Sequence, residues 1–116
     1  MEKLSKLESA VLERLANTYP FLKKQIPYLM VKDRKATGVG MYVNFEYLNN
    51  SEDFEDMTVP YLALSTNENI EMEGLEYGLG FEVDITNGKI KFIEFITYGE
   101  DTWDGSLGEF RFVDGV

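Results

Sequence analysis

The sequence contains neither cysteine nor histidine. Without cysteine the chain can form no disulfide, and it offers neither a thiolate nucleophile nor a cysteine-ligated zinc site. Without histidine it lacks the Ser-His-Asp and Cys-His arrangements and imidazole metal ligands. The remaining catalytic chemistry is that of carboxylates, lysines and tyrosines, and no recognisable catalytic motif combines them. The sequence therefore predicts a protein that is not an enzyme and needs no cofactor.

Long apolar runs are missing as well. No stretch approaches the roughly 20 apolar residues that a membrane-spanning helix needs, and the charged start does not resemble the apolar part of a signal peptide. The acidic segment from Glu100 begins like a calcium-binding loop, but its twelfth position is Arg111 where that loop requires glutamate. We therefore expect a cytoplasmic protein without a metal site and without a membrane partner.

Basic residues are scarce and unevenly placed. The 116 residues include 11 Lys and Arg against 21 Asp and Glu, a net charge of −10. Residues 1–35 hold eight basic residues and four acids (+4), whereas residues 36–116 hold three basic residues and 17 acids (−14). An anionic surface repels nucleic acid and anionic lipid, and it attracts a basic protein. Ordinary solubility explains the same charge equally well, so the charge alone does not decide for a partner.

The hydrophobic pattern predicts an α+β fold in a single domain spanning residues 1–116. The length fits one domain, and 44% hydrophobic residues suffice for a core. Apolar residues three and four apart predict an amphipathic helix over 3–17, and Pro20 suits the start of a second, short helix that Pro27 limits. One or two helices followed by strands predict packing on a mostly antiparallel sheet. The expected strands are 28–35, 41–48, 59–65, 70–72, a hairpin over 79–98, and 109–113.

The hairpin is the clearest local prediction. Asn87-Gly88 lies between alternating apolar residues and favours a two-residue type I′ turn, which fixes the register of the two strands. The predicted cross-strand pairs are Ile85 with Ile90, Asp84 with Lys91, Val83 with Phe92, and Phe81 with Glu94.

That register places Glu94 on the same face as Val83 and Phe92. A buried carboxylate is costly unless it is hydrogen-bonded, and such a position is a candidate for a perturbed pKa and for function. The alternatives are that a bulge turns Glu94 outwards or that the core ends there. Ile93 and Phe95 make the other face partly apolar, which indicates a central strand covered on both sides.

Two acidic loops, 50–58 and 100–104, form the candidate binding surface. Trp103, the only tryptophan, lies among acids, which is typical of an anchor that meets a basic partner. A tryptophan in a loop also commonly folds back over the edge of a sheet. The candidate binding residues are Phe54, Glu55, Asp56, Glu100, Asp101, Trp103 and Asp104.

Three segments carry a resemblance that spans most of the chain. They are Thr37-Gly-Val-Gly40 running into Met41-Tyr-Val-Asn-Phe45, then Gly74-Leu-Glu-Tyr-Gly-Leu-Gly-Phe81, and finally Ile96-Thr-Tyr98 with Trp103 and Leu107-Gly-Glu-Phe-Arg-Phe112. In these the chain resembles a family of small uncharacterised bacterial proteins. The resemblance implies a bacterial source and one domain. It implies no activity, and relatives often have histidine where Tyr77 stands.

Three functional interpretations follow. The first is a non-catalytic, acidic module that neutralises or escorts a basic protein, similar in kind to bacterial immunity proteins. The alternative is a small-ligand-binding protein or enzyme that uses Glu94 with Tyr77 or Tyr98 at one end of the sheet. The third is a homo-oligomer that pairs through the outer side of residues 91–98.

Overall fold

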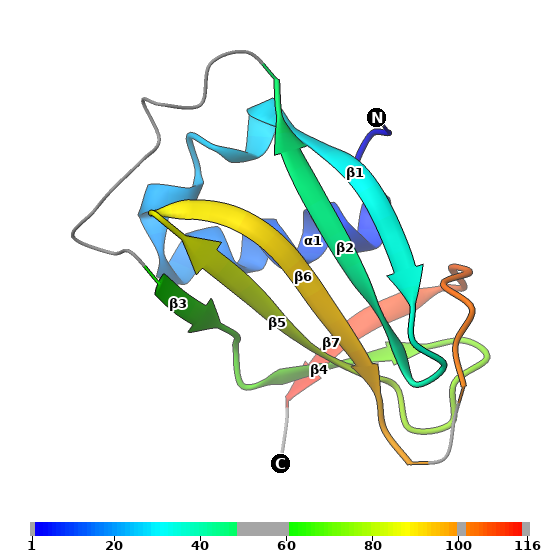
Figure 1. Ribbon diagram of the computed structural model, residues 1–116. Helices are drawn as coiled ribbons and strands as arrows, with labels where there is room; N and C mark the ends of the chain where they lie inside the picture. The colour runs from blue at the N-terminus through cyan, green and yellow to red at the C-terminus, as the bar shows by residue number, and fades with distance from the viewer. Residues whose placement is uncertain (1, 49–60, 100–101, 115–116) are drawn as a thin grey trace.

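The computed structural model describes residues 2–48, 61–99 and 102–114. In these residues one α-helix and two short 3₁₀ helices pack on a seven-stranded antiparallel sheet (Figure 1), which confirms the α+β prediction. The helices are α1 (Lys6–Thr18), η1 (Pro20–Leu22) and η2 (Ile26–Tyr28). The strands are β1 (Leu29–Ala36), β2 (Gly40–Tyr47), β3 (Tyr61–Leu64), β4 (Glu68–Met72), β5 (Leu79–Thr86), β6 (Lys89–Thr97) and β7 (Phe110–Asp114).

Helix α1 is capped at Ser5 and therefore starts later than the sequence pattern predicts. The Ser5 hydroxyl accepts a hydrogen bond from the Glu8 N–H at 3.1 Å, and the Ser5 N–H donates to Glu8 Oε1 at 2.7 Å. This reciprocal pair satisfies donors that the start of a helix leaves open. Beyond α1, Pro20 opens η1 as predicted, but the segment forms two 3₁₀ turns in place of a second α-helix. None of the described helices is long and apolar enough to cross a membrane.

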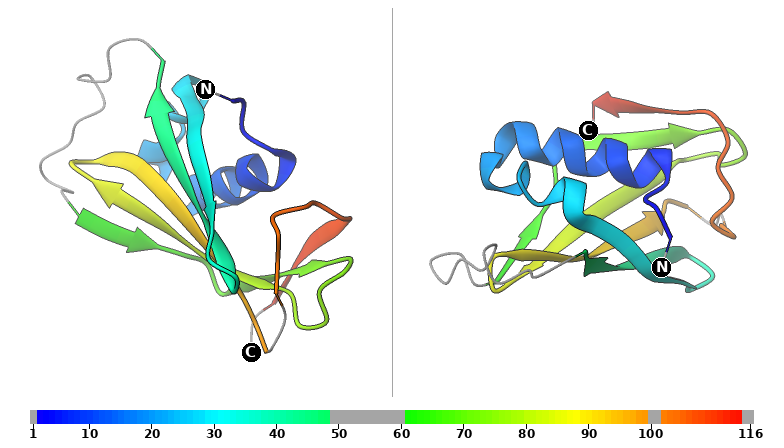
Figure 2. Two further views of the ribbon diagram at one scale, coloured as in Figure 1. Left: turned by 45° about the vertical axis from the view of Figure 1, so that its right-hand side comes forward. Right: turned by 90° about the horizontal axis from the view of Figure 1, so that it is seen from above.

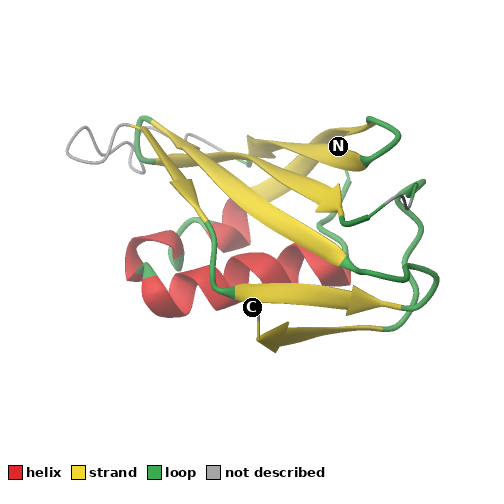
Figure 3. Ribbon diagram, turned by 90° about the horizontal axis from the view of Figure 1, so that it is seen from below, coloured by secondary structure: helices red, strands yellow, loops and turns green. Residues whose placement is uncertain are grey.

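The sheet curves around α1. Its strand order is β1-β2-β6-β5-β4-β7, and β3 also pairs with β5. The right-hand view of Figure 2 shows α1 between the β4–β7 pair and the β1–β2–β6–β5 strands, and Figure 3 shows the same arrangement from below. The concave face packs on α1, and we call the opposite side the outer face. The largest fully buried side chains of the core include Leu7, Leu12, Leu15, Ile70, Leu79, Ile85, Ile90, Ile93 and Phe95.

The β5–β6 hairpin turns at Asn87-Gly88, as predicted. Both residues have positive φ (54° and 77°), the conformation that a type I′ turn requires. Ile85 pairs with Ile90, again as predicted. Beyond this pair the predicted register is wrong, because a β-bulge makes Lys91 an extra residue without a partner in β5.

The bulge turns Glu94 to the outer face, where it lies opposite Glu82 instead of Phe81. This is the alternative that avoids burying a carboxylate in the core. The predicted pairing of Asp84 with Lys91 is also wrong, because Asp84 lies opposite Phe92.

Strand β6 is central, between β2 and β5, as predicted. Its inward residues are Ile93 and Phe95, which are buried against the core. The prediction that the strand is covered on both faces is wrong for the described residues, since Ile96 on the outer face is 44% exposed. The sheet therefore has one face packed on α1 and one face that no described segment covers.

Candidate binding surface

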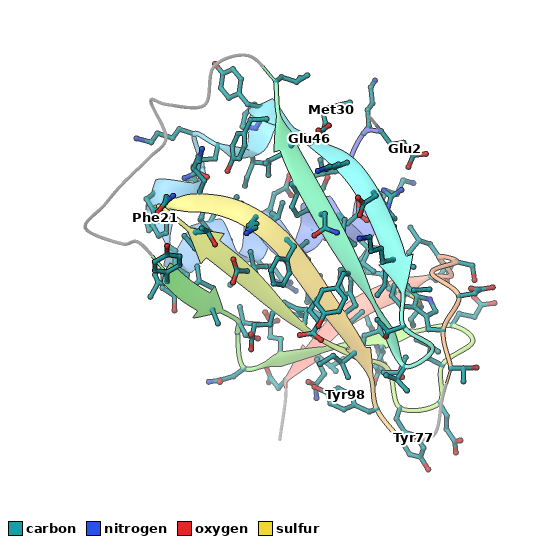
Figure 4. The ribbon with its side chains drawn as sticks, in the orientation of Figure 1. Glu2, Phe21, Met30, Glu46, Tyr77 and Tyr98 are labelled. Carbon is teal, nitrogen blue, oxygen red and sulfur yellow. The ribbon has the colours of Figure 1, made fainter. Side chains whose placement is uncertain are left out.

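The outer face combines aromatic rings with carboxylates. Figure 1 looks onto this face, with α1 behind the strands, and Figure 4 adds the side chains in the same orientation. Tyr42 of β2 and Phe92 of β6 meet edge to face, with ring centroids 5.6 Å apart. Next to them Glu94 pairs in register with Tyr42 on one side and with Glu82 on the other. The middle of the outer face is thus a cross-strand row of Tyr42, Glu94 and Glu82, with Lys35 of β1 paired with Tyr42 at the end of the row.

Glu94 and Glu82 are like charges directly opposite each other, an arrangement that destabilises a strand pair. Tyr42 partly offsets this repulsion, because its hydroxyl donates a hydrogen bond to the Glu94 carboxylate. That hydrogen bond and the negative charge of Glu94 raise the pKa of the Tyr42 hydroxyl. Glu82 is exposed. A cation placed between the two carboxylates would relieve their repulsion.

We expect Glu94→Gln to lower the pKa of Tyr42. The amide cannot supply the negative charge that holds the phenol proton in place, so ionisation becomes easier. The measurement is a pH titration of the tyrosine rings by NMR, with Tyr42→Phe used to assign the resonance. An unchanged Tyr42 titration would mean that Glu94 does not face Tyr42 in solution.

Two tyrosines cover glycines at the end of the sheet (both are labelled in Figure 4). A Cβ added at Gly80 would lie 2.3 Å from the Tyr98 hydroxyl, and one at Gly99 would lie 2.5 Å from the Tyr77 ring. The Tyr98 hydroxyl also donates to Asn69 Oδ1 at 3.1 Å. The absence of side chains at these glycines lets both rings lie against the backbone, with Tyr77 59% exposed.

The residues of the alternative site are spread along the outer face, with Tyr77 and Tyr98 at its end. Tyr98 follows Glu94 by four residues along the chain, a separation of about 13 Å in an extended strand. Glu94 is engaged by Tyr42, while Tyr77 and Tyr98 lie at the end of the sheet near Asn69. The Tyr98 hydroxyl lies over Gly80, the partner of Ile96, so its ring reaches back from that end towards Glu94.

Beyond Tyr77 the outer face deepens into an acidic groove, which lies on β4, β7 and the turn 73–78. Its volume is about 700 Å³, within the range of ligand-binding clefts. Arg111 Nε donates to Glu71 Oε2 at 2.7 Å across the two strands. Among the described residues that line the groove, one basic side chain thus offsets one of four carboxylates. The charged side chains of the acidic groove are Glu71, Glu73, Glu76, Glu109 and Arg111.

Trp103 belongs to the core and is not presented as an exposed anchor. It is 7% exposed, and its ring packs edge to face on Phe95 with centroids 5.8 Å apart. Its Nε1–H donates to the Ser106 carbonyl at 2.9 Å. The tryptophan thus folds back over the sheet, because burying its large ring is more favourable than exposing it to water.

Of the other predicted binding residues, Asp104 is described and exposed. Hydrogen bonds from the hydroxyl and the N–H of Ser106 lower the pKa of Asp104, the latter at 2.9 Å. The rest of the predicted set, Phe54, Glu55, Asp56, Glu100 and Asp101, lies outside the described residues.

Sequence reasoning missed Tyr42, Phe92 and Glu82 as surface groups. The signal for Tyr42 was present, because it alternates with the buried Met41 and Val43 in the strand pattern. The predicted hairpin register places Phe92 in the core because it contains no bulge at Lys91.

Among the described residues no group of three or more acidic side chains is arranged to hold a metal ion. Comparison of the chain with family models, with curated proteins and with solved structures found no match. The resemblance to a family of small bacterial proteins therefore stays a prediction, and the function has to be argued from the surface itself.

Proposed function

We propose that this chain is a non-catalytic module that binds a basic protein of the cytoplasm and neutralises or escorts it, as an immunity protein does. The observation that carries the proposal is the asymmetry of the sheet. One face is packed on α1, and the other presents Tyr42, Phe92, Glu82 and Glu94 with no described segment over them. Antiparallel sheets often leave one face to water, and the aromatic groups on this one supply the kind of side chain that is enriched in interfaces.

The chemistry of this face favours a lysine or arginine of a partner. The facing carboxylates of Glu82 and Glu94 suit a guanidinium, which can donate to two acceptors at once. Tyr42 and Phe92 beside them supply ring faces for a cation–π contact and apolar area for an interface core. A net charge of −10 adds long-range attraction for a basic protein and speeds its association.

The other two interpretations are less well supported. A small ligand would have to compete with Tyr42 for the Glu94 carboxylate and with Asn69 for the Tyr98 hydroxyl. A homo-oligomer formed through the outer side of 91–98 would bring the Glu82 and Glu94 carboxylates of two copies together, and each copy carries a net charge of −10.

The experiment is capture from a lysate of the source organism with the tagged protein, at low and at high salt, followed by mass spectrometry. We expect one basic protein retained near one-to-one at low salt and released at high salt, because salt screens the exposed charges. Recovery of the bait alone at both salt concentrations would overturn the proposal.

A further inference from the structure

Strand β7 ends the sheet with an edge that no described residue pairs. The sheet order ends at β7, whose only partner among the described strands is β4. Figure 3 shows β7 at the margin of the sheet. The backbone N–H and C=O groups along such an edge are open to pairing with another extended chain.

The opposite edge of the sheet is protected. The N-terminal segment crosses β1 at a bridge in which the Glu2 N–H donates to the Val31 carbonyl at 3.0 Å and the Val31 N–H donates back at 2.7 Å. β1 also has a bulge after Val31 and carries Lys32 and Lys35. Bulges and lysines are the devices that keep an edge strand from pairing. In β7 neither lysine nor a bulge is present within its five residues.

The register identifies the groups that face the free edge. The Glu73 N–H donates to the Glu109 carbonyl, so Glu109 faces β4 with its backbone groups. These orientations alternate along an antiparallel strand, so Arg111 and Val113 also face β4. The N–H and C=O groups of Phe110 and Phe112 therefore point away from the sheet.

Hollows flank β7 on both faces, and the side chains of an added strand would point alternately to these two faces. On the outer side lies the acidic groove, with Glu73, Glu76 and Glu109. On the inner side a second groove runs between β7 and α1, where the Arg14 guanidinium stacks 4.0 Å from the centre of the half-buried Phe112 ring.

We propose that β7 accepts an extended basic segment of the partner protein as an additional strand. Lysine or arginine side chains at alternate positions of that segment enter the acidic groove, and the intervening apolar side chains lie towards Phe110 and Phe112. This inference rests on the proposed function, since it assumes a basic partner. A second copy of the chain fits less well, because pairing β7 with β7 would bring two acidic grooves together.

The test is amide hydrogen exchange by NMR with a synthetic octapeptide of alternating lysine and valine. We expect the peptide to slow exchange at Phe110 and Phe112 by about tenfold or more at saturation, because their N–H groups become hydrogen-bonded. Arg111 and Val113, whose N–H groups face β4, serve as internal controls and stay protected with and without peptide. The same peptide with glutamate in place of lysine is expected to have no effect.

The outcomes separate this inference from the function on which it rests. Suppose the peptide changes chemical shifts only around Tyr42 and Glu94 and leaves the amide exchange of Phe110 and Phe112 unchanged. This result would overturn the strand addition and would still support the proposed binding function. No response anywhere on the protein would count against both. Slower exchange at Phe110 and Phe112 on raising the protein concentration alone would assign the edge to a second copy and overturn the basic partner.

Discussion

Gly40→Ala is expected to destabilise the protein by about 3 kcal/mol. Overpacking typically costs about 1–3 kcal/mol, and a substitution that displaces backbone lies at the upper end of this range. Gly40 pairs in register with Ile96, and a Cβ at this position would lie 1.9 Å from the carbonyl oxygen of Phe95. The obstacle is backbone of the central strand, so β2 has to move away from β6. Thermal unfolding would show this as a fall in Tm of about 10 °C for a domain of this size.

Gly80→Ala is the matched control for this substitution. Its Cβ would meet the Tyr98 hydroxyl at 2.3 Å, which is the far end of a partly exposed side chain that can swing into solvent. We expect a loss below about 1 kcal/mol, typical of a surface change. Equal losses at Gly40 and Gly80 would show that close approach of β2 and β6 is not what Gly40 provides. The close approach of β2 and β6 also places Tyr42 beside Glu94, so Gly40 helps to form the binding surface.

Arg34→Met is expected to destabilise the protein by about 2–3 kcal/mol. The Glu8 side chain is 4% exposed, and its two oxygens accept from Arg34 Nε at 2.8 Å and Nη2 at 2.9 Å. The same hydrogen bonds raise the pKa of the Arg34 guanidinium, with a further contribution from Glu2. Removing one partner of a buried pair leaves the other charge uncompensated, at a cost of about 3–5 kcal/mol that partial exposure of Arg34 reduces.

Arg111→Met tests whether burial is the cause. Arg111 and Glu71 also make a short ion pair, at 2.7 Å, but their side chains are 75% and 55% exposed. Exposed pairs contribute about 0–1 kcal/mol, so we expect little change in the denaturant midpoint. A loss at Arg111 as large as that at Arg34 would contradict this explanation.

The helix and the hairpin turn were predictable because their signals are local. The Asn87-Gly88 pair specifies its turn through backbone conformation alone, and the structure gives both residues the expected positive φ. The bulge at Lys91 was not predictable in the same way. Apolar residues occur on both sides of β6, so periodicity allows Phe92 or Ile93 to face the core, and only the cost of burying Glu94 argued for the shift.

The candidate surface was harder to predict than the fold. The side chains of Tyr42, Glu82 and Glu94 come from three strands, and their meeting depends on the order of strands in the sheet. Sequence distance gives no hint of that order. The acidic neighbours of Trp103 in the sequence favour an exposed anchor. Its contact with Phe95 is a tertiary contact, which the neighbouring residues in the chain do not reveal.

The central claim is that the outer face of the sheet binds the basic partner. The most direct measurement compares capture from source lysate by the unmodified protein, by Glu82→Gln and by Thr18→Lys, after unfolding curves have shown that all three are folded. Both variants change the net charge from −10 to −9 (−10 + 1), and both residues are exposed. Thr18 lies at the end of α1, on the other side of the sheet, and lines neither of the two grooves beside β7. We predict that Glu82→Gln loses the partner and Thr18→Lys keeps it. Equal retention by the two variants, or equal loss, would contradict the account.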